Sequence, residues 1–255
     1  MSIQELCTVR ERQALNSTMF ALTMEAPRIS AAAQPGQFVH ITCGEANLLR
    51  RPISICQAQD GLLKIVFVVK GEGTKWLSER KAGDVLDILG PQGHGFDMDA
   101  LGAHPVFIGG GIGVPPMLLT MQTARANGAQ PSAILGFRNR DAVILEEDFQ
   151  ALGTTYVATD DGSYGIHGFV SDVLGAHIEE YTSVGCCGPK PMLRALASIA
   201  EEAGIPCQVS MEERMGCGIG ACLVCACALK AKDGETRYGH VCKDGPVFDS
   251  KEVEW

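Results

Sequence analysis

The sequence has no long run of apolar residues and no block of basic residues. Its longest apolar stretch, residues 62–69, is interrupted by Lys64 and is too short to cross a bilayer. The first ten residues contain Glu5 and Arg10 and lack the apolar core of a secretion signal. The 21 Lys and Arg residues are scattered and the net charge is −9, which disfavours contacts with nucleic-acid phosphates. These absences predict a cytoplasmic protein that binds neither a membrane nor nucleic acid.

The sequence also lacks the two close cysteine pairs that a structural zinc site usually has, although it contains eleven cysteines. Without a secretion signal, so many cysteines are expected to be reduced thiols and metal ligands. Four of them follow the spacing C-x4-C-x2-C with a distant fourth member: Cys217, Cys222, Cys225 and Cys242. This spacing is typical of plant-type [2Fe–2S] ferredoxins. We predict an iron–sulfur cluster at these four residues, with structural zinc as the alternative.

The residue types in this stretch suit a cluster. Thiolates are the soft anionic ligands that iron–sulfur clusters require. Three glycines can adopt backbone conformations closed to other residues and so turn amide groups toward the sulfur atoms; they are Gly216, Gly218 and Gly220. Cys227 is a fifth thiol within reach, but the x2 spacing favours Cys225 as the ligand. We therefore expect Cys227 to lie in a buried strand.

The first hundred residues predict a small antiparallel β-barrel. Turn signals such as Pro35-Gly36 and Asp60-Gly61 separate six short β-leaning segments, a spacing that is typical of barrels. The segments are residues 7–10, 18–24, 38–42, 53–56, 62–69 and 85–89. A helix is expected over residues 74–80, with Thr74 as its N-cap.

Two motifs in this region suit the phosphates of a dinucleotide: R-P-I-S at residues 51–54 and G-E-G-T at residues 71–74. An arginine at a strand edge offers a bidentate fork to a pyrophosphate. A Gly-Thr pair that opens a helix offers backbone N–H groups and a hydroxyl to the same anion. Each motif alone also fits a solvated strand edge or a simple helix cap. Their pairing predicts a dinucleotide site.

From about residue 105 the sequence alternates between strands and helices. Strand 106–108 precedes a glycine-rich turn and a helix with Pro115 near its start, the order found in nucleotide-binding units. The candidate phosphate-binding residues of the turn are Gly110, Gly111 and Gly113, although proline replaces the last glycine of the usual fingerprint. Further strands are expected at 132–137, 155–159, 181–186 and 208–211, and helices at 146–152, 168–175 and 190–203. This alternation predicts a doubly wound parallel α/β sheet.

Ligands of such sheets bind beyond the carboxyl ends of the strands. Two predicted strands end at Cys186-Cys187 and at Asp160-Asp161, so a cysteine could line a nicotinamide pocket and an aspartate could meet a ribose hydroxyl. A buried small residue and a turn-forming Asp-Gly are the simpler interpretations. Arg138 and Arg140 follow the second strand of this domain and could meet a 2′-phosphate, which leaves NAD and NADP both open.

The order of these motifs resembles the ferredoxin–NADP reductase family: R-P-x-S, G-x-G-T, G-G-G-I-G-x-P-P and then C-G-P-x-P-M. Two further strings are similar to the electron-transfer subunits of two-subunit, NAD-linked dihydroorotate dehydrogenases. They are M-E-E-R-M-G-C-G-I-G-A-C-x-x-C from Met211 and Y-G-H-V-C-K-D-G-P-V-F at residues 238–248. The resemblance implies a flavin-binding barrel at 1–100, an NAD-binding α/β domain at 101–210 and a [2Fe–2S] segment at 211–255.

The resemblance also implies the residues of each site. FAD would be held by Arg51, Pro52, Ile53 and Ser54, by Val66, Phe67 and Val68, and by Gly73 and Thr74. Val68 departs from relatives that carry a basic side chain there. The four cysteines of the C-x4-C-x2-C motif and its distant member would bind the cluster. Ser54 would lie near the reactive nitrogen of the flavin, and Cys187 near the nicotinamide.

The function implied by this resemblance is electron transfer in pyrimidine biosynthesis. A partner subunit with its own FMN would oxidise dihydroorotate, and electrons would pass through the [2Fe–2S] cluster and FAD to NAD+ in a heterotetramer with two copies of each subunit. A flavin is needed because a cluster transfers one electron and a nicotinamide accepts two. The alternatives are a stand-alone NAD(P)H reductase that serves an oxygenase or a ferredoxin, and a non-enzymatic zinc module.

Overall fold

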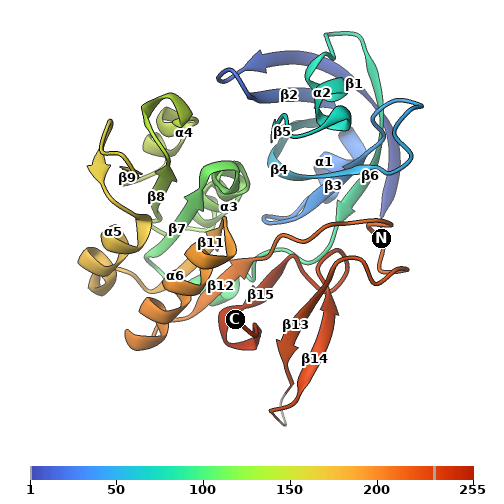
Figure 1. The fold of residues 1–255 in the computed structure, drawn as a ribbon. Helices are drawn as coiled ribbons and strands as arrows, with labels where there is room; N and C mark the ends of the chain where they lie inside the picture. The colour runs from blue at the N-terminus through green and yellow to red at the C-terminus, as the bar shows by residue number, and fades with distance from the viewer. Residues whose placement is uncertain (1, 232–233) are drawn as a thin grey trace.

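The computed structural model describes residues 2–231 and 234–255, and its N-terminal part is a closed antiparallel barrel (Figure 1). The strands pair in the order β1-β2-β5-β4-β3-β6. Side chains such as Val39 and Ile41 fill the barrel, because every second residue of a strand points inward. The predicted barrel is confirmed, with strands β1 (Ile3–Ala14), β2 (Met19–Glu25), β3 (Phe38–Ile41), β4 (Arg51–Gln59), β5 (Leu62–Val68) and β6 (Val85–Gln92).

Two short helices accompany the barrel. The helix α1 (Pro27–Ala32) has no counterpart among the predicted helices. The helix α2 (Glu72–Ser78) lies where a helix was expected, but its N-cap is Gly71, so the prediction of Thr74 as N-cap is wrong. The Thr74 hydroxyl instead reaches back from the first turn and accepts hydrogen bonds from the amides of Lys70 at 2.9 Å and Gly71 at 3.2 Å. Thr74 thus satisfies amides at the helix start from inside the helix.

The middle of the chain forms a seven-stranded sheet in the order β10-β9-β8-β7-β11-β12-β15. All neighbouring strands are parallel except β15, which runs antiparallel to β12. The strands are β7 (Pro105–Gly110), β8 (Ser132–Phe137), β9 (Thr155–Thr159), β10 (Ile166–His167), β11 (Ser183–Cys187), β12 (Cys207–Ser210) and β15 (Val247–Asp249). From β7 the chain winds out through β8 and β9 to β10 on one side and later returns to β11 on the other. The switch point of the sheet therefore lies between β7 and β11.

Helices cover both faces of this sheet, as the predicted doubly wound fold requires (Figure 1). One face packs on α3 (Val114–Ala126) and α4 (Glu146–Gln150), and the other on α5 (Val170–His177) and α6 (Lys190–Glu202). The short 3-10 turns are η1 (Asp99–Leu101), η2 (Gly111–Gly113), η3 (Arg140–Ala142), η4 (Ile178–Glu180) and η5 (Ser250–Glu252). Within the described residues, no helix has both the length and the apolar character needed to cross a bilayer.

The last segment of the chain is built into the sheet. After Met211 it forms a loop that carries Cys217, Cys222 and Cys225 and is called the cysteine loop here. A hairpin of β13 (Ala226–Lys230) and β14 (Thr236–His240) follows, and the chain then returns as β15 beside β12. The Met211 amide donates to the Pro246 carbonyl at 2.8 Å, which closes the base of the segment. Apart from the buried strand expected around Cys227, these strands were not predicted.

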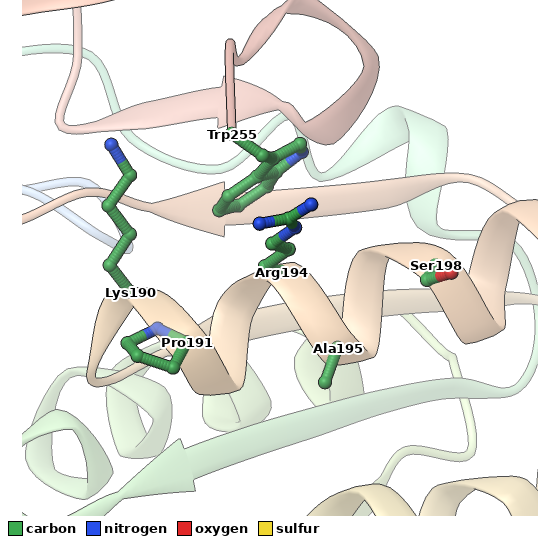
Figure 2. Close-up of a pocket in the computed structure, with 6 residues that line it drawn as sticks. All are labelled: Lys190, Pro191, Arg194, Ala195, Ser198 and Trp255. Carbon is green, nitrogen blue, oxygen red and sulfur yellow. The ribbon is translucent and has the colours of Figure 1, made fainter.

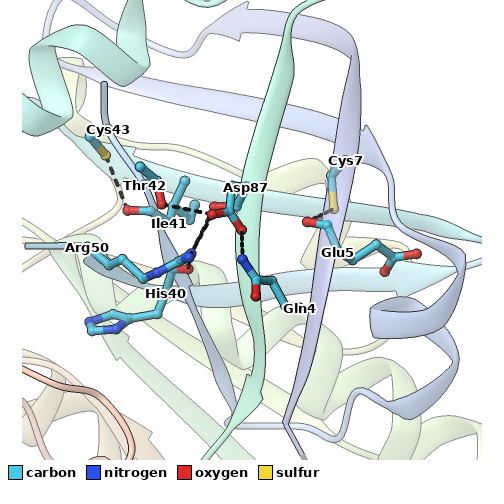
Figure 3. Close-up of polar contacts among 9 residues, drawn as sticks. All are labelled: Gln4, Glu5, Cys7, His40, Ile41, Thr42, Cys43, Arg50 and Asp87. Atoms are coloured by element: carbon cyan, nitrogen blue, oxygen red, sulfur yellow. Dashed lines mark hydrogen bonds and ion pairs between the residues drawn. The ribbon is translucent and has the colours of Figure 1, made fainter. Parts of the chain in front are cut away.

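A polar network ties three barrel strands together (Figure 3). On β6, Asp87 accepts hydrogen bonds from Arg50 Nη2 at 2.7 Å, Gln4 Nε2 at 3.0 Å and Thr42 Oγ1 at 3.4 Å. Arg50 Nη1 also donates to the His40 carbonyl oxygen at 3.2 Å. Burial alone would raise the pKa of Asp87, but the hydrogen bonds from Gln4 and Arg50 and the Arg50 charge hold that pKa below its usual range. Asp87 is therefore ionised at neutral pH.

We expect Asp87→Asn to lower the free energy of unfolding by about 1 kcal/mol at neutral pH, because partly exposed charged hydrogen bonds contribute modestly. Folding lowers the pKa of Asp87, so its contribution is present above the unfolded-state pKa and is lost as the pH falls through the folded-state pKa. Urea unfolding of both proteins at about pH 7 and about pH 3 measures the difference. An equal difference at both pH values would contradict the assignment. Thr42→Val removes only the 3.4 Å contact and is the milder control.

Candidate functional site

A cleft of about 900 Å³ separates the barrel from the carboxyl ends of the sheet strands. One wall comes from β4 and β5, and the other from the turns that follow β7, β8, β9 and β11. The predicted flavin and nucleotide residues line this cleft, except Gly73 and Arg140, and so does Cys187. The volume is that of a cofactor site. Folding thus brings the barrel motifs and the glycine-rich turn to one place.

Arg51 lies on the barrel side of the cleft, against the start of α2. Its Nη2 donates to Asn47 Oδ1 at 3.0 Å, and its Nη1 donates to the Leu49 carbonyl oxygen. Gly73 lies directly behind the guanidinium, because a Cβ on Gly73 would be 2.5 Å from Arg51 Nε. Gly73 therefore serves the cleft indirectly, by leaving room for Arg51.

The glycine-rich turn after β7 packs closely against the end of β11. A Cβ on Gly113 would lie 2.2 Å from the Cys187 carbonyl oxygen, and one on Gly110 would lie 2.5 Å from Met192 Sδ. Gly111 has a φ of +54°, which glycine adopts without strain. The turn continues through η2 into α3, which has proline in its first turn. The glycines therefore let the start of α3 lie at the cleft, as a phosphate-binding turn requires.

Cys187 ends β11 and is the thiol that faces the cleft. Burial raises the pKa of this thiol to about 12, so it is neutral at physiological pH and is not a nucleophile. The preceding residue, Cys186, is fully buried in the core below the sheet. Of the two adjacent thiols, only Cys187 is available to a ligand.

Of the predicted residues at the ends of β8 and β9, some line the cleft and others make contacts within their own turns. Asp160 and Arg138 line the cleft. The neighbouring Asp161 accepts a hydrogen bond from the Ser163 amide at 2.9 Å and so stabilises its own turn. Arg140 lies over the ring of Tyr164, with 5.5 Å between its Cζ and the ring centroid. One carboxylate and one guanidinium from these two turns therefore face the nucleotide side of the cleft.

The cysteine loop turns its backbone amides toward sulfur, as its glycines predict. Three amides point at Cys217 Sγ: those of Ile219 at 3.5 Å, Ala221 at 3.2 Å and Cys222 at 3.4 Å. The Gly220 amide lies 3.2 Å from Cys242 Sγ. Burial alone would raise the pKa of Cys217, but the amides of Ile219, Ala221 and Cys222 and the Cys222 side chain hydrogen-bond its sulfur and lower that pKa to about 6. The loop is built to hold a thiolate.

The β13–β14 hairpin brings the fourth cysteine to the loop. The Val241 amide donates to the Cys225 carbonyl at 3.0 Å, and Cys242 Sγ lies 3.3 Å from Cys225 Sγ. Cys217 and Cys222 face each other across their own turn. Two thiol pairs suit a cluster of two irons, each of which takes two cysteines.

Two of the four cysteines at the cysteine loop are buried and two are partly exposed. Cys225 and Cys242 are 1% exposed, whereas Cys217 and Cys222 reach the surface in part. Cys227 is buried in β13, as predicted. Three apolar side chains beside the partly exposed cysteines project into solvent and are called the loop rim here: Ile219, Leu223 and Val224, with exposures of 53%, 77% and 56%.

A second pocket of about 530 Å³ lies on the outer side of α6 (Figure 2). Lys190 and Arg194 of α6 border it, and Trp255 lines it from the end of the chain. Trp255 Nε1 donates to the Ser250 carbonyl at 3.2 Å, which anchors the end of the chain. None of the predicted site residues lines this pocket. The chemistry of the site therefore belongs to the cleft and the cysteine loop.

Several residues of the cleft were not predicted: Phe38, Lys70, Phe169 and Glu212. Lys70 brings a basic side chain to the cleft two residues beyond Val68. Phe38 carries no motif. Only its place on β3 opposite Ser54 of the R-P-I-S motif could have indicated it, and that pairing is a tertiary feature.

Solved structures with a similar fold include reductases. One, from a study of flavin-based electron bifurcation by the NADH-dependent reduced ferredoxin–NADP oxidoreductase, has a TM-score of 0.88 at 28% identity and covers 98% of this chain and 90% of that chain. A ferredoxin NADP+ reductase from Neisseria gonorrhoeae with bound FAD and NADP has a TM-score of 0.67 at 16% identity, over 79% of this chain and 92% of that one. Fold and site together define a flavoprotein of the ferredoxin reductase type with an iron–sulfur segment.

The relatives narrow this class further. Residues 212–254 match the family model described as the iron–sulfur cluster binding domain of dihydroorotate dehydrogenase B. The chain is 43% identical to the electron transfer subunit of dihydroorotate dehydrogenase B (NAD(+)) from Geobacillus thermodenitrificans and 42% identical to that from Bacillus caldolyticus, over 98% of each sequence. The chain belongs to this family of electron transfer subunits. The predicted resemblance is confirmed.

We expect Gly73→Ala to weaken FAD retention about tenfold, because the new methyl group displaces Arg51 from the start of α2 and a charged hydrogen bond is lost. The fold should persist, since the displaced atoms end a flexible side chain. Fluorescence titration of flavin-free protein with FAD measures the change. Gly71→Ala is the matched control, because a Cβ there meets nothing within 4 Å. Equal affinities in the two variants would refute the role given to Gly73.

Proposed function

We propose that this chain delivers electrons from an FMN-containing catalytic subunit, which oxidises dihydroorotate, to NAD+ in pyrimidine biosynthesis. One observation carries the proposal: the cleft and the cysteine loop share a wall. Phe38 lines the cleft and also packs in the same buried cluster as Cys225 and Cys242. A flavin in the cleft and a cluster on the loop would therefore be neighbours. The stand-alone reductase reading is less favoured, because the family relatives are named as subunits.

When bound, FAD exchanges hydride with NAD(H) and single electrons with the [2Fe–2S] cluster. The chain supplies the positions and charges for this chemistry. Arg51, Lys70 and the β7 turn provide donors for phosphates, and Ser54 lines the cleft where its hydroxyl can hydrogen-bond the flavin ring. Cys187, as a neutral thiol, provides a small uncharged wall for the nicotinamide. The four cysteines and the amides around them hold the cluster.

The proposed function divides the chain into three segments, each of which binds one cofactor. Residues 1–100 form the FAD domain, 101–210 the NAD domain and 211–255 the cluster segment, with β15 of that segment completing the NAD-domain sheet. All eleven cysteines are free thiols, which supports a reducing, cytoplasmic location. The nucleotide is NAD, in keeping with the NAD(+) enzymes that the relatives' names describe.

The partner docks on the loop rim and completes a heterotetramer with two copies of each subunit. Exposed apolar side chains beside a redox centre favour an interface, since a partner would shield them from water and shorten the distance to its own flavin. The relatives are named electron transfer subunits, a role separate from the oxidation of dihydroorotate itself. Oxidation of that substrate therefore belongs to the partner, and the isolated chain should reduce artificial acceptors with NADH without oxidising dihydroorotate.

Replacement of one cluster ligand tests the electron path. Cys225→Ala should lose most of its iron because a cluster needs all four thiolates, whereas Cys227→Ala should keep its iron because that thiol packs in β13. Both variants should keep FAD and its bleaching by NADH. Iron, zinc and flavin are measured on anaerobically purified protein, with the visible spectrum recorded before and after NADH. Zinc at the site of the wild-type protein, or iron loss in both variants, would overturn the assignment.

A charge on the loop rim tests the docking face. Leu223→Asp should weaken binding of the FMN subunit at least about tenfold, because a buried unpaired charge at an interface is strongly unfavourable. Ile166→Asp is the control, since β10 lies at the opposite edge of the sheet from β15. Sedimentation velocity of the mixed subunits gives the affinity. Undiminished assembly of the Leu223→Asp variant, with its iron and flavin intact, would place the interface elsewhere.

A further inference from the structure

His40 is a buried polar side chain without a protein partner. It is 0% exposed, and neither Nδ1 nor Nε2 makes a hydrogen bond to any described residue. Buried polar groups in folded proteins are almost always hydrogen-bonded, and an unpaired donor costs considerable free energy. The orphaned ring therefore points to a group that is absent from the polypeptide itself.

His40 lies next to residues of the cleft on one side and to the cysteine loop on the other. On β3 it lies on the same side as Phe38, with 6.2 Å between the two ring centroids, and it pairs across to Pro52 of β4. Both of these neighbours line the cleft. On its other side the ring packs against the cysteine loop, because a Cβ on Gly218 would be 2.4 Å from His40 Nδ1. His40 thus lies between the cleft and the residue that follows Cys217.

The backbone holds the ring in this place. The His40 carbonyl accepts a hydrogen bond from Arg50 Nη1 at 3.2 Å, and Arg50 is fixed in turn by its 2.7 Å contact with Asp87 (Figure 3). Burial, together with the charges of Arg50 and Arg51, lowers the pKa of His40 to about 4. The imidazole is therefore neutral and carries one N–H donor.

The neighbours of the ring decide where this donor is directed. Phe38 and Pro52, on the cleft side, have no side-chain acceptor. The cysteine loop, on the other side, carries the sulfur atoms of a cluster, which accept hydrogen bonds readily when they are anionic. A sulfur acceptor also explains why Gly218 has no side chain, since any Cβ would push the ring away from the loop.

We propose that His40 is a positioning residue for the iron–sulfur centre, which donates a ring N–H hydrogen bond to a sulfur atom of the bound cluster and thereby raises its reduction potential. This inference rests on the proposed function. Reduction adds negative charge to the cluster, so a hydrogen-bond donor stabilises the reduced form more than the oxidised form. His40 would thereby favour entry of an electron into the cluster beside the flavin cleft.

The test compares three variants of the full-length protein loaded with FAD and cluster. His40→Phe keeps a planar ring and removes the donor, whereas His40→Asn keeps an N–H near the position of Nδ1. Tyr181→Phe is the control, because it removes a buried hydroxyl beside the start of β11, at the end of the strand opposite the cleft. Redox titration followed by electron paramagnetic resonance gives the cluster potential, and visible absorbance gives the flavin potential.

We expect His40→Phe to shift the one-electron reduction equilibrium of the cluster about tenfold toward the oxidised form, equivalent to about 59 mV. The iron content and flavin potential of His40→Phe should match those of the wild type. His40→Asn should recover part of the shift in cluster potential, and Tyr181→Phe should leave the cluster potential unchanged. An unchanged cluster potential in His40→Phe, a shift of the flavin alone, or a His40→Asn variant as shifted as His40→Phe would overturn the proposal. Absence of a cluster from the wild-type protein would instead refute the proposed function.

Discussion

The structure depends on holding four thiol groups from two separate stretches at one place. Three of them come from a loop whose amides turn toward sulfur, and the fourth arrives through the register of a hairpin. Like-charged thiolates repel one another unless a metal centre and directed N–H groups compensate them. The surrounding segment therefore has to be rigid. The contact of Met211 with Pro246 and the pairing of β15 with β12 provide that rigidity by anchoring both ends of the segment to the sheet.

This anchoring also fixes the position of the cysteine loop relative to the cleft. The loop cysteines Cys225 and Cys242 pack in one buried cluster with Phe38 of the barrel and Val209 of the sheet, so barrel, sheet and loop share a core. A close-packed core of this kind resists displacement. Electron transfer between two centres depends on a short and constant distance. The shared core therefore holds the cysteine loop in place against the barrel and the sheet.

Much of the fold was predictable because its signals are local. The strand and helix periodicities gave both domains, and β8 and β9 have the predicted bounds. The failures have identifiable causes. Thr74 was predicted as an N-cap from its type, yet its hydroxyl caps from within the first turn of α2. The strands β14 and β15 were missed because they are short and lack an alternating apolar pattern. Gly73 lies behind the Arg51 guanidinium, and its predicted contact with FAD stays a prediction.

The sequence by itself predicted the cluster ligands and the two phosphate motifs, because metal and phosphate chemistry requires certain residue types at short, regular spacings. Only the tertiary structure decided which side chains of these motifs and their neighbours come together at the site. The neighbouring Arg50 and Arg51 look alike in the chain, but strand alternation sends one to Asp87 and the other to the cleft. His40 carries no motif, and it acquires a place in the site only because β3 packs beneath Gly218, more than 170 residues away in the sequence. Such contacts arise from long-range pairing, which spacing along the chain does not encode.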